Sequence, residues 1–384
     1  MSFAAALSRH PDTAVAVGEV VGSVLEEIGS RPDLAFVAVS SAHVPHVEQA
    51  AATVQTLLDP SAFIGTTASG VVGGAEGVED APCIALWAAR WDRSVDLHPA
   101  HLRALPVGGG GGPSGSGWTF EGLPDGPSDT LLMVADPYTF PAPEFFNFVA
   151  RQHGPTAVIG GLASGATSAG GNRLIIGGRV VRQGAVAVPL PSTVLSRVVV
   201  SQGCRPIGRP LTVTKSESNL LLELAGKPAL AQVVELLESL DADERRLAAQ
   251  GLHCGIVVNE SRLDFDRGDF LIRGVMGADR SRGAVAIGDY VGVGATVQFQ
   301  VRDAVSAAED LAEWLGDTPE RGALLFTCNG RGAAMFGESD HDPRLVSERV
   351  GPAVAGLFCA GEIGPIGNRN ALHGFTASMA LFRS

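Results

Sequence analysis

Residues 34–40 read LAFVAVS and residues 63–70 read FIGTTASG, and both segments recur 95 positions later along the chain. The second copies read DTLLMVA at 129–135 and VIGGLASG at 158–165, so Ala-Ser-Gly ends the second segment each time. All four segments are runs of apolar and small residues without polar alternation, which is typical of strands covered on both faces of a sheet. The sequence therefore predicts that one structural unit occurs twice in the amino-terminal half.

Each copy continues in the same order beyond these strands. A helical stretch follows the first strand, at 44–58 in one copy and at 143–152 in the other, and further strands follow the second. The copies extend over about 34–90 and 129–190, and the same order reappears within 324–382 as a third copy. We therefore expect an α/β fold with duplicated βαββ-type units, in which helices cover mixed sheets.

The length of the chain predicts more than one domain. At 384 residues it exceeds one typical hydrophobic core, so we expect two domains, at 1–226 and 227–384. The second domain begins with a helix rich in Glu and Leu over 229–250. Apolar segments separated by turn residues then predict an antiparallel meander across 270–301, and a final helix is expected at 304–315.

The charge balance excludes some partners. The chain carries 41 acidic and 28 basic residues, a formal net charge of −13, and no run of Lys or Arg. We therefore expect no nucleic-acid partner and no association with an anionic membrane surface. No stretch of about eighteen apolar residues predicts a membrane span. Residues 1–16 contain Arg9 and His10 and do not read as a signal peptide.

The spacing of cysteines and histidines predicts neither disulfides nor a metal site. The five cysteines are scattered without a CxxC pair, which favours reduced thiols and a cytoplasmic protein. His43 and His46, like His98 and His101, have a spacing found in metal sites, but a proline interrupts each pair.

The glycine-rich residues 108–117 lack the lysine of a phosphate-binding loop and predict a surface loop. We expect no metal and no cofactor.

Three polar clusters near the carboxyl end are candidates for a functional site. They read CNGRG at 328–332, GEIGPIGN at 361–368 and HGFT at 373–376, and an apolar run precedes each of the first two. Polar groups at the ends of buried strands commonly form sites in α/β proteins, and glycine permits close approach of a ligand. Arg331 could grip a carboxylate with its planar fork, and Glu362 could receive an ammonium group. The alternative is three tight turns with solvated charges.

Several further residues have open roles. Ser69 and Ser164, which are equivalent in the two copies, either hydrogen-bond a ligand or cap the turn that follows. Arg302 is expected to form a structural ion pair with the adjacent Asp303 that braces the site. His373 stands in no metal pattern and beside no nucleophile, so a buried, hydrogen-bonded histidine is expected.

Cys328 supports a second interpretation. A nearby guanidinium lowers the pKa of a thiol, so Arg331 would favour the reactive thiolate. With Glu362 and His373 as acid and base groups, Cys328 would complete the arrangement of a thiol-dependent enzyme. The alternative is an inert buried cysteine. No Gly-x-Ser-x-Gly motif is present, which argues against a serine hydrolase.

Taken in order, the motifs of this chain resemble those of the FIST-domain family. The resemblance covers about 33–381 and rests on the three clusters above together with GCRPIG at 203–208, GKPA at 226–229, FLIR at 270–273 and VQFQVRD at 297–303. It implies an amino-terminal and a carboxyl-terminal FIST domain, in a stand-alone bacterial protein with no kinase, methyl-accepting or F-box segment attached. It also implies a sensory role in signal transduction, with a small ligand such as an amino acid and a signalling protein as partners.

The leading hypothesis is a cytoplasmic sensory protein that binds its ligand in a cleft between two α/β domains. The expected ligand-binding residues are Ser69, Ser164, Arg302, Cys328, Arg331, Glu362 and His373. Replacing Arg331 by alanine is expected to abolish binding while the melting temperature stays nearly unchanged. A thiol-dependent enzyme that uses Cys328, His373 and Glu362 is the alternative.

Overall fold

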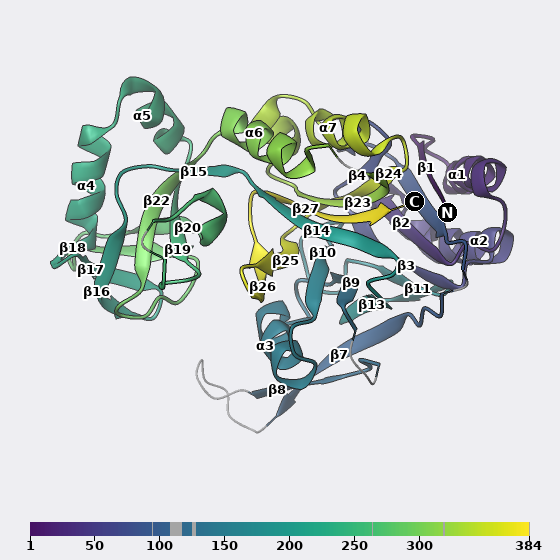
Figure 1. Ribbon diagram of the computed structural model, residues 1–384, viewed down its shortest axis with the longest axis horizontal. Coiled ribbons are helices and arrows are strands. Elements are labelled where there is room, and N and C mark those ends of the chain that lie inside the picture. Colours follow the sequence, from purple (N-terminus) through teal and green to yellow (C-terminus); the bar gives the residue numbers. More distant parts are fainter. Residues whose placement is uncertain (94, 108–116, 125–127, 263, 318, 384) are drawn as a thin grey trace. The chain divides into compact units, whose positions relative to one another are not determined.

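The computed structural model describes residues 1–384 except 94, 108–116, 125–127, 263, 318 and 384 (Figure 1). The glycine-rich loop expected at 108–117 therefore lies, apart from Gly117, outside the described residues. The chain forms two compact units. The first contains 1–200, 311–372 and 376–384, and the second contains 201–310 and 373–375. The first unit is therefore discontinuous in the sequence, since the chain returns to it after residue 310. The division into two domains at residue 226 stays a prediction.

Three sheets of the first unit follow one plan. Each contains two parallel strands with a helix between them in the sequence. The first copy has β2 (Leu34–Ser40), α2 (Val47–Leu58) and β3 (Ala62–Ala68), the second has β9 (Thr130–Ala135), α3 (Ala142–Gln152) and β10 (Ala157–Leu162), and the third has β23 (Glu320–Cys328), α7 (His341–Val350) and β24 (Val354–Cys359). An antiparallel strand flanks the first strand of each pair: β6 (Ile84–Arg90), β13 (Ala185–Leu190) or β27 (Thr376–Arg383). The predicted α/β fold with duplicated units and mixed sheets is confirmed.

The three copies exchange strands in a closed cycle. β4 (Gly70–Gly73) follows β3 in the sequence but pairs with β24 of the third copy. β11 (Leu174–Ile176) follows β10 and pairs with β3 of the first copy. β25 (Glu362–Ile366) follows β24 and pairs with β10 of the second copy. Each sheet is therefore completed by a strand from another copy, and the three copies form one compact unit.

The remaining strands of the first unit lie at or near the sheet edges, and helical segments complete it. The strands are β1 (Ser2–Ser8), β5 (Glu76–Glu79), β7 (Ala100–Val107), β8 (Gly117–Glu121), β12 (Arg179–Val181), β14 (Leu195–Gln202) and β26 (Arg369–His373). The helical segments are α1 (Thr13–Ile28), a 3-10 turn at Ser41–His46 and a π-helical turn at Gly332–Phe336. Asp12 caps α1, because its side chain accepts hydrogen bonds from the amides of Ala14 and Val15.

Both faces of these sheets are covered, which explains the unbroken apolar runs in the sequence. Phe36 of β2 packs into a core shared by all three sheets, together with Trp87, Leu132 and Phe326. The next residue, Val37, packs on the opposite face against α1 and α2. Helix α3 covers the second sheet in the same way, and α6 (Ala304–Leu315) with α7 covers the third. Alternate side chains therefore enter different cores, and both cores require apolar residues.

The second unit contains a closed antiparallel barrel. Its strands in spatial order are β16 (Leu211–Glu217), β17 (Leu220–Leu224), β21 (Ala284–Ile287), β20 (Phe270–Asp279), β19 (Leu252–Val257) and β22 (Thr296–Arg302). β19 pairs with β22 and β22 pairs with β16, which closes the ring. β15 (Cys204–Pro206) pairs with another part of β22, β18 (Lys227–Pro228) pairs with β17, and Arg267–Asp269 forms a 3-10 turn. The predicted antiparallel meander is therefore part of a barrel.

The long helix predicted at 229–250 is divided in two. Helix α4 (Ala229–Ser239) ends before Leu240, and α5 (Ala242–Ala249) begins after Asp241 (Figure 1). The carboxylate of Asp241 accepts a hydrogen bond from the amide of Glu244 and caps the second helix, which is why the helix restarts there. The helix predicted at 304–315 is present as α6. Within the described residues, no helix is both long enough and apolar enough to cross a bilayer.

Candidate functional site

The third copy of the first unit brings the polar clusters of the sequence together. Strands β23 and β24 run parallel, and Cys328 and Cys359 lie opposite each other where the two strands end. The turn after β23 carries Arg331, and the turn after β24 leads into β25, which begins with Glu362. Parallel strands present their carboxyl ends at the same sheet edge, which is why clusters more than thirty residues apart in the sequence meet here.

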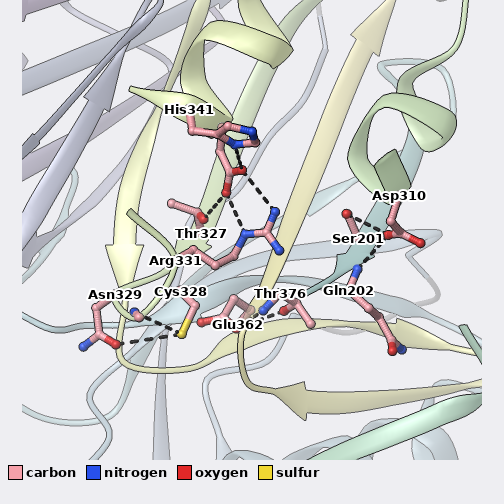
Figure 2. Close-up of polar contacts among 12 residues, drawn as sticks. Ser201, Gln202, Asp310, Thr327, Cys328, Asn329, Arg331, His341, Glu362 and Thr376 are labelled. Atoms are coloured by element: carbon pink, nitrogen blue, oxygen red, sulfur yellow. Dashed lines mark hydrogen bonds and ion pairs between the residues drawn. The ribbon is translucent and has the colours of Figure 1, made fainter. Parts of the chain in front are cut away.

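Arg331 is paired with an acidic residue that the sequence analysis did not identify. Its Nε lies 2.7 Å from Oδ2 of Asp342, and its Nη2 lies 3.0 Å from Oδ1 (Figure 2). Thr327 donates a further hydrogen bond of 2.7 Å to Oδ2, and Nδ1 of His341 lies 3.0 Å from Oδ1. Arg331 is 0% exposed and Asp342 is 3% exposed, so the pair is buried.

The charge of Asp342 is stabilised despite its burial. Burial alone would raise the pKa of this carboxyl, but the charge of Arg331 and hydrogen bonds from three side chains lower it well below its usual range. Two nitrogens of the Arg331 guanidinium, Nε and Nη2, therefore bind a carboxylate of the protein itself. The expectation that Arg331→Ala leaves the melting temperature nearly unchanged does not fit a buried ion pair, since removing one partner leaves the other charge uncompensated.

Glu362 is the second buried acid of this region, and its environment is the opposite of that of Asp342. Its Oε2 accepts hydrogen bonds from the amide and the hydroxyl of Thr376, at 3.1 and 2.9 Å. Its Oε1 is buried and has no hydrogen-bond partner among the described residues. Burial raises the pKa of Glu362 to about 8, against the hydrogen bonds from Thr376 and Cys328 and the charge of Arg331, which lower it. Near neutral pH this carboxyl is therefore mostly protonated.

Cys328 lies beside this carboxyl, in surroundings that differ from those of Cys83, Cys254 and Cys359. The amide of Gly330 donates a hydrogen bond to its sulfur over 3.4 Å, and its side chain acts to lower the pKa of Glu362. It is 7% exposed. Burial raises the pKa of the thiols of Cys83 and Cys254, to about 11 and about 12, and that of Cys359 well above its ordinary value. We name Cys328, Arg331, Asp342, Glu362 and Thr376 together the Glu362 cluster.

The two equivalent serines of the repeat contact each other. Oγ of Ser164 lies 2.9 Å from the amide nitrogen of Ser69 and 3.2 Å from its Oγ. The hydroxyl of Ser164 also donates a hydrogen bond to the carbonyl of Phe358, the residue before Cys359. These contacts join the first, second and third copies through one hydroxyl. These contacts differ from both roles considered from the sequence, a turn cap and a ligand contact, and neither serine is fully buried.

The other two predicted residues belong to the second unit. Arg302 does not form the expected ion pair with Asp303, because Asp303 pairs instead with Nε of Arg205 at 2.9 Å. Nη2 of Arg302 donates to the carbonyl of Gln250 over 2.8 Å. His373 is 5% exposed, as expected for a buried histidine. The structure thus assigns five of the seven predicted site residues to the first unit and two to the second.

Several residues of the Glu362 cluster and its surroundings were not identified from the sequence. Asp342, Thr327 and His341 stand outside the glycine-framed motifs, and nothing in their local sequence marks them as partners of Arg331. Thr376 belongs to the HGFT motif, but its sequence neighbours do not indicate that it binds Glu362.

Within the described residues, no group of three or more His, Cys, Asp or Glu side chains is placed to hold a metal ion.

Two cavities are lined by residues outside the Glu362 cluster. One of about 490 Å³ in the first unit is bordered by Trp91, Arg93 and Val194. Another of about 350 Å³ in the second unit is bordered by Arg209, Gln232 and Phe299. No predicted site residue lines either cavity, so the volume of a cavity does not identify the site, and the case for the Glu362 cluster rests on its buried polar groups.

Comparison with known families agrees with the motifs. The model of the FIST N domain matches residues 33–227, and the model of the FIST C domain matches residues 229–365. The uncharacterized protein Rv0628c of Mycobacterium tuberculosis is 41% identical over 392 residues, which covers 100% of both chains. The uncharacterized protein Mb0898c of Mycobacterium bovis is 41% identical over 390 residues, which covers 100% of this chain and 99% of that protein.

Proposed function

This chain belongs to the family of proteins with a FIST N and a FIST C domain, domains associated with sensory signal transduction, and on this premise we propose that it senses a small metabolite bound at the Glu362 cluster. The proposed ligand carries an amino group, as an amino acid does. A sensor of this kind passes its state to a signalling protein, which is the second partner in the proposal. We place its action in the cytoplasm, in keeping with five free cysteines.

One observation carries the proposal: Oε1 of Glu362 is buried without a partner among the described residues. Buried polar atoms in proteins nearly always have a hydrogen-bond partner, and an atom without one indicates a position that a ligand or water occupies. Arg331 is the neighbouring cation, but its Nε and Nη2 donate to Asp342. It forms no hydrogen bond with Oε1 of Glu362. A ligand ammonium group would supply both a hydrogen bond and a charge partner to Glu362.

The other predicted residues of the first unit have supporting roles in this proposal. Arg331 fixes the turn beside Glu362 through its pairing with Asp342 and contributes positive potential. Cys328 borders the carboxyl and acts to lower its pKa. Ser69 and Ser164 provide hydroxyls where the copies of the repeat meet. In this arrangement the ligand amine is recognised by Glu362, and the ligand body by the surrounding groups.

Binding of an ammonium group would change the protonation of Glu362. The carboxyl is mostly protonated near neutral pH and would have to lose its proton to pair with a cation. Affinity for an amine should therefore rise as the pH increases towards about 8, and one proton should be released on binding at lower pH. An amine bound without proton release would contradict the role given to Glu362.

Native mass spectrometry of the freshly purified protein tests the proposal. The intact mass is compared with the mass after denaturation, and the difference gives the mass of a bound metabolite. We expect a difference that is lost in Glu362→Gln, which keeps the shape of the carboxyl and removes its charge. The matched control is Glu348→Gln on the exposed face of α7, which should retain the metabolite. Titration of the emptied protein with amino acids, showing no binding at any pH, would overturn the proposal.

A second candidate function rests on the surroundings of Cys328. Its sulfur accepts a hydrogen bond from the amide of Gly330, an interaction that favours a thiolate, and its neighbour Glu362 has a pKa suited to proton transfer near neutral pH. A thiol-dependent enzyme would use Cys328 as nucleophile and Glu362 as general base. His373, the third residue of that hypothesis, belongs to the second unit.

A further inference from the structure

We propose that the barrel of the second unit carries a separate binding site for a small carboxylate, formed by Gln300, His253 and Arg302 beside the ring of Phe375. This inference goes beyond the function proposed above and does not depend on it, since none of these residues belongs to the Glu362 cluster. It concerns residues of β19 and β22, which are neighbouring strands of the barrel (Figure 1).

The strand register places the polar side chains on one face. Along β22, Phe299 and Val301 pack into the main core of the second unit. Because neighbouring residues of a strand face opposite sides, Gln300 and Arg302 lie on the other face. His253 of β19 is directly opposite Gln300 in the pairing of the two strands. Two polar residues of β22 and one of β19 therefore share the same side of the sheet.

Gln300 is buried with its whole amide unsatisfied. It is 0% exposed, and neither its Nε2 nor its Oε1 has a hydrogen-bond partner among the described residues. Its head group lies over Gly255, where the Cβ of any larger residue would be only 2.3 Å from Nε2. Gly255 therefore makes space for this amide, although apolar residues such as Phe270 and Ile272 occupy the same face. A buried amide without partners is costly, so its retention indicates that something pairs with it.

His253 adds a second unsatisfied group. It is 5% exposed, and its Nδ1 has no hydrogen-bond partner within the described part of the chain. Burial lowers the pKa of His253 to about 4, with the charge of Arg302 acting in the same direction, so the imidazole is neutral near pH 7. A neutral imidazole offers one donor and one acceptor, and it can therefore hydrogen-bond either a carboxylate or a hydroxyl.

Arg302 supplies the charge that identifies the ligand class. Its Nε is buried and unpaired among the described residues, and none of their carboxylates forms an ion pair with it. Its guanidinium carbon lies 5.0 Å from the centre of the Phe375 ring, which also meets the His253 ring edge-on at 4.8 Å. Phe375 adopts a backbone φ of 60°, a conformation that a bulky residue adopts only when its packing holds it there.

These groups together match a carboxylate. The N–H groups of Arg302 and Gln300 can each donate to one carboxylate oxygen, a charge-assisted arrangement that would also neutralise the guanidinium. The side-chain Oε1 of Gln300 and Nδ1 of His253 can then accept hydrogen bonds from a hydroxyl or amide group of the same ligand. The carbon atoms of the ligand would pack against Phe375. Buried water is the competing occupant, because it can satisfy the same hydrogen bonds but not the charge.

The experiment uses the full-length protein with acetate, glycolate and succinate as probes, and acetamide, glycolamide and succinamide as uncharged controls. Binding is followed by the melting temperature and by the NMR signals of the Gln300 side-chain amide. We expect at least one carboxylate, and none of the amides, to raise the melting temperature and shift these signals. Gln300→Leu and Arg302→Gln should each weaken the binding of that carboxylate about tenfold or more.

Two controls separate the outcomes. Gln298→Leu removes a neighbouring glutamine whose Nε2 already donates to the carbonyl of Gly208 over 2.8 Å, so it should lower stability but preserve carboxylate binding. Glu362→Gln should also preserve it, whatever becomes of the function proposed for that cluster. The proposal is overturned if no carboxylate affects the wild-type protein, which would assign the position to water, or if Gln300→Leu binds the carboxylate as tightly as the wild type.

Discussion

Arg331 donates two hydrogen bonds to the carboxylate of Asp342, from Nε over 2.7 Å and from Nη2 over 3.0 Å, and both side chains are buried. We therefore expect Arg331→Ala and Asp342→Asn each to lower the free energy of unfolding by about 3–5 kcal/mol, because each leaves an uncompensated buried group. Urea denaturation measures the change. The exposed pair of Arg344 and Glu338 is the control, and Arg344→Ala should cost less than about 1 kcal/mol. Wild-type stability in Arg331→Ala would contradict this account of the pair.

The buried carboxyl of Glu362 should make stability depend on pH. Its pKa is raised from 4.5 to about 8 in the folded protein, so the folded state holds a proton that the unfolded state has lost between these values. This stabilising contribution is complete below pH 4.5 and is lost as the pH rises through about 8. Across this range the free energy of unfolding should decline by on the order of a few kcal/mol. Glu362→Gln mimics the protonated carboxyl and should flatten this decline.

Thermal unfolding from about pH 5 to about pH 9 measures this difference. Glu348→Gln, an exposed substitution on α7, should show the same decline as the wild type. Parallel curves for the wild type and Glu362→Gln would mean that Glu362 ionises with an ordinary pKa.

Cys328 should be the first cysteine to react with an alkylating reagent near neutral pH. Its sulfur lies in polar surroundings, whereas burial raises the pKa of Cys83 to about 11 and that of Cys254 to about 12. Peptide mass mapping after a short exposure to iodoacetamide should show label on Cys328 before the other four. The denatured protein, in which all five should label alike, is the control. Equally slow labelling of all five in the native state would remove the basis for the thiol-dependent enzyme.

Gly356 should tolerate no side chain. It lies in β24 opposite Leu325, and a Cβ at this position would be 1.7 Å from the carbonyl oxygen of Leu325. Gly356→Ala should therefore cost at least about 2–3 kcal/mol of stability, because the pairing of β23 and β24 must be displaced. Gly18 in α1 is the matched control, since a Cβ there would meet nothing within 4 Å. Gly18→Ala should stabilise the protein by about 1 kcal/mol, and equal effects at both sites would refute this reasoning.

The repeated α/β unit and much of its local structure can be read from the sequence alone. Unbroken apolar runs such as 34–40 predicted buried strands, and the register of Ala-Ser-Gly made Ser69 and Ser164 equivalent before any contact was known. Glycines beside charged residues also marked Arg331 and Glu362 as candidates. These features are readable because burial on both faces of a strand, helical periodicity and turns each leave a pattern within a few consecutive residues.

Which residues of distant segments meet depends on the tertiary fold. The exchange of β4, β11 and β25 among the three copies, the closure of the barrel, and the pairing of Arg331 with Asp342 all join segments that have no common local pattern. The same holds for the contrast between Asp342 and Glu362, two buried acids whose pKa values shift in opposite directions. The pKa of a carboxyl depends on the charges and donors packed around it, and long-range strand pairing, not the adjacent sequence, brings those groups into place.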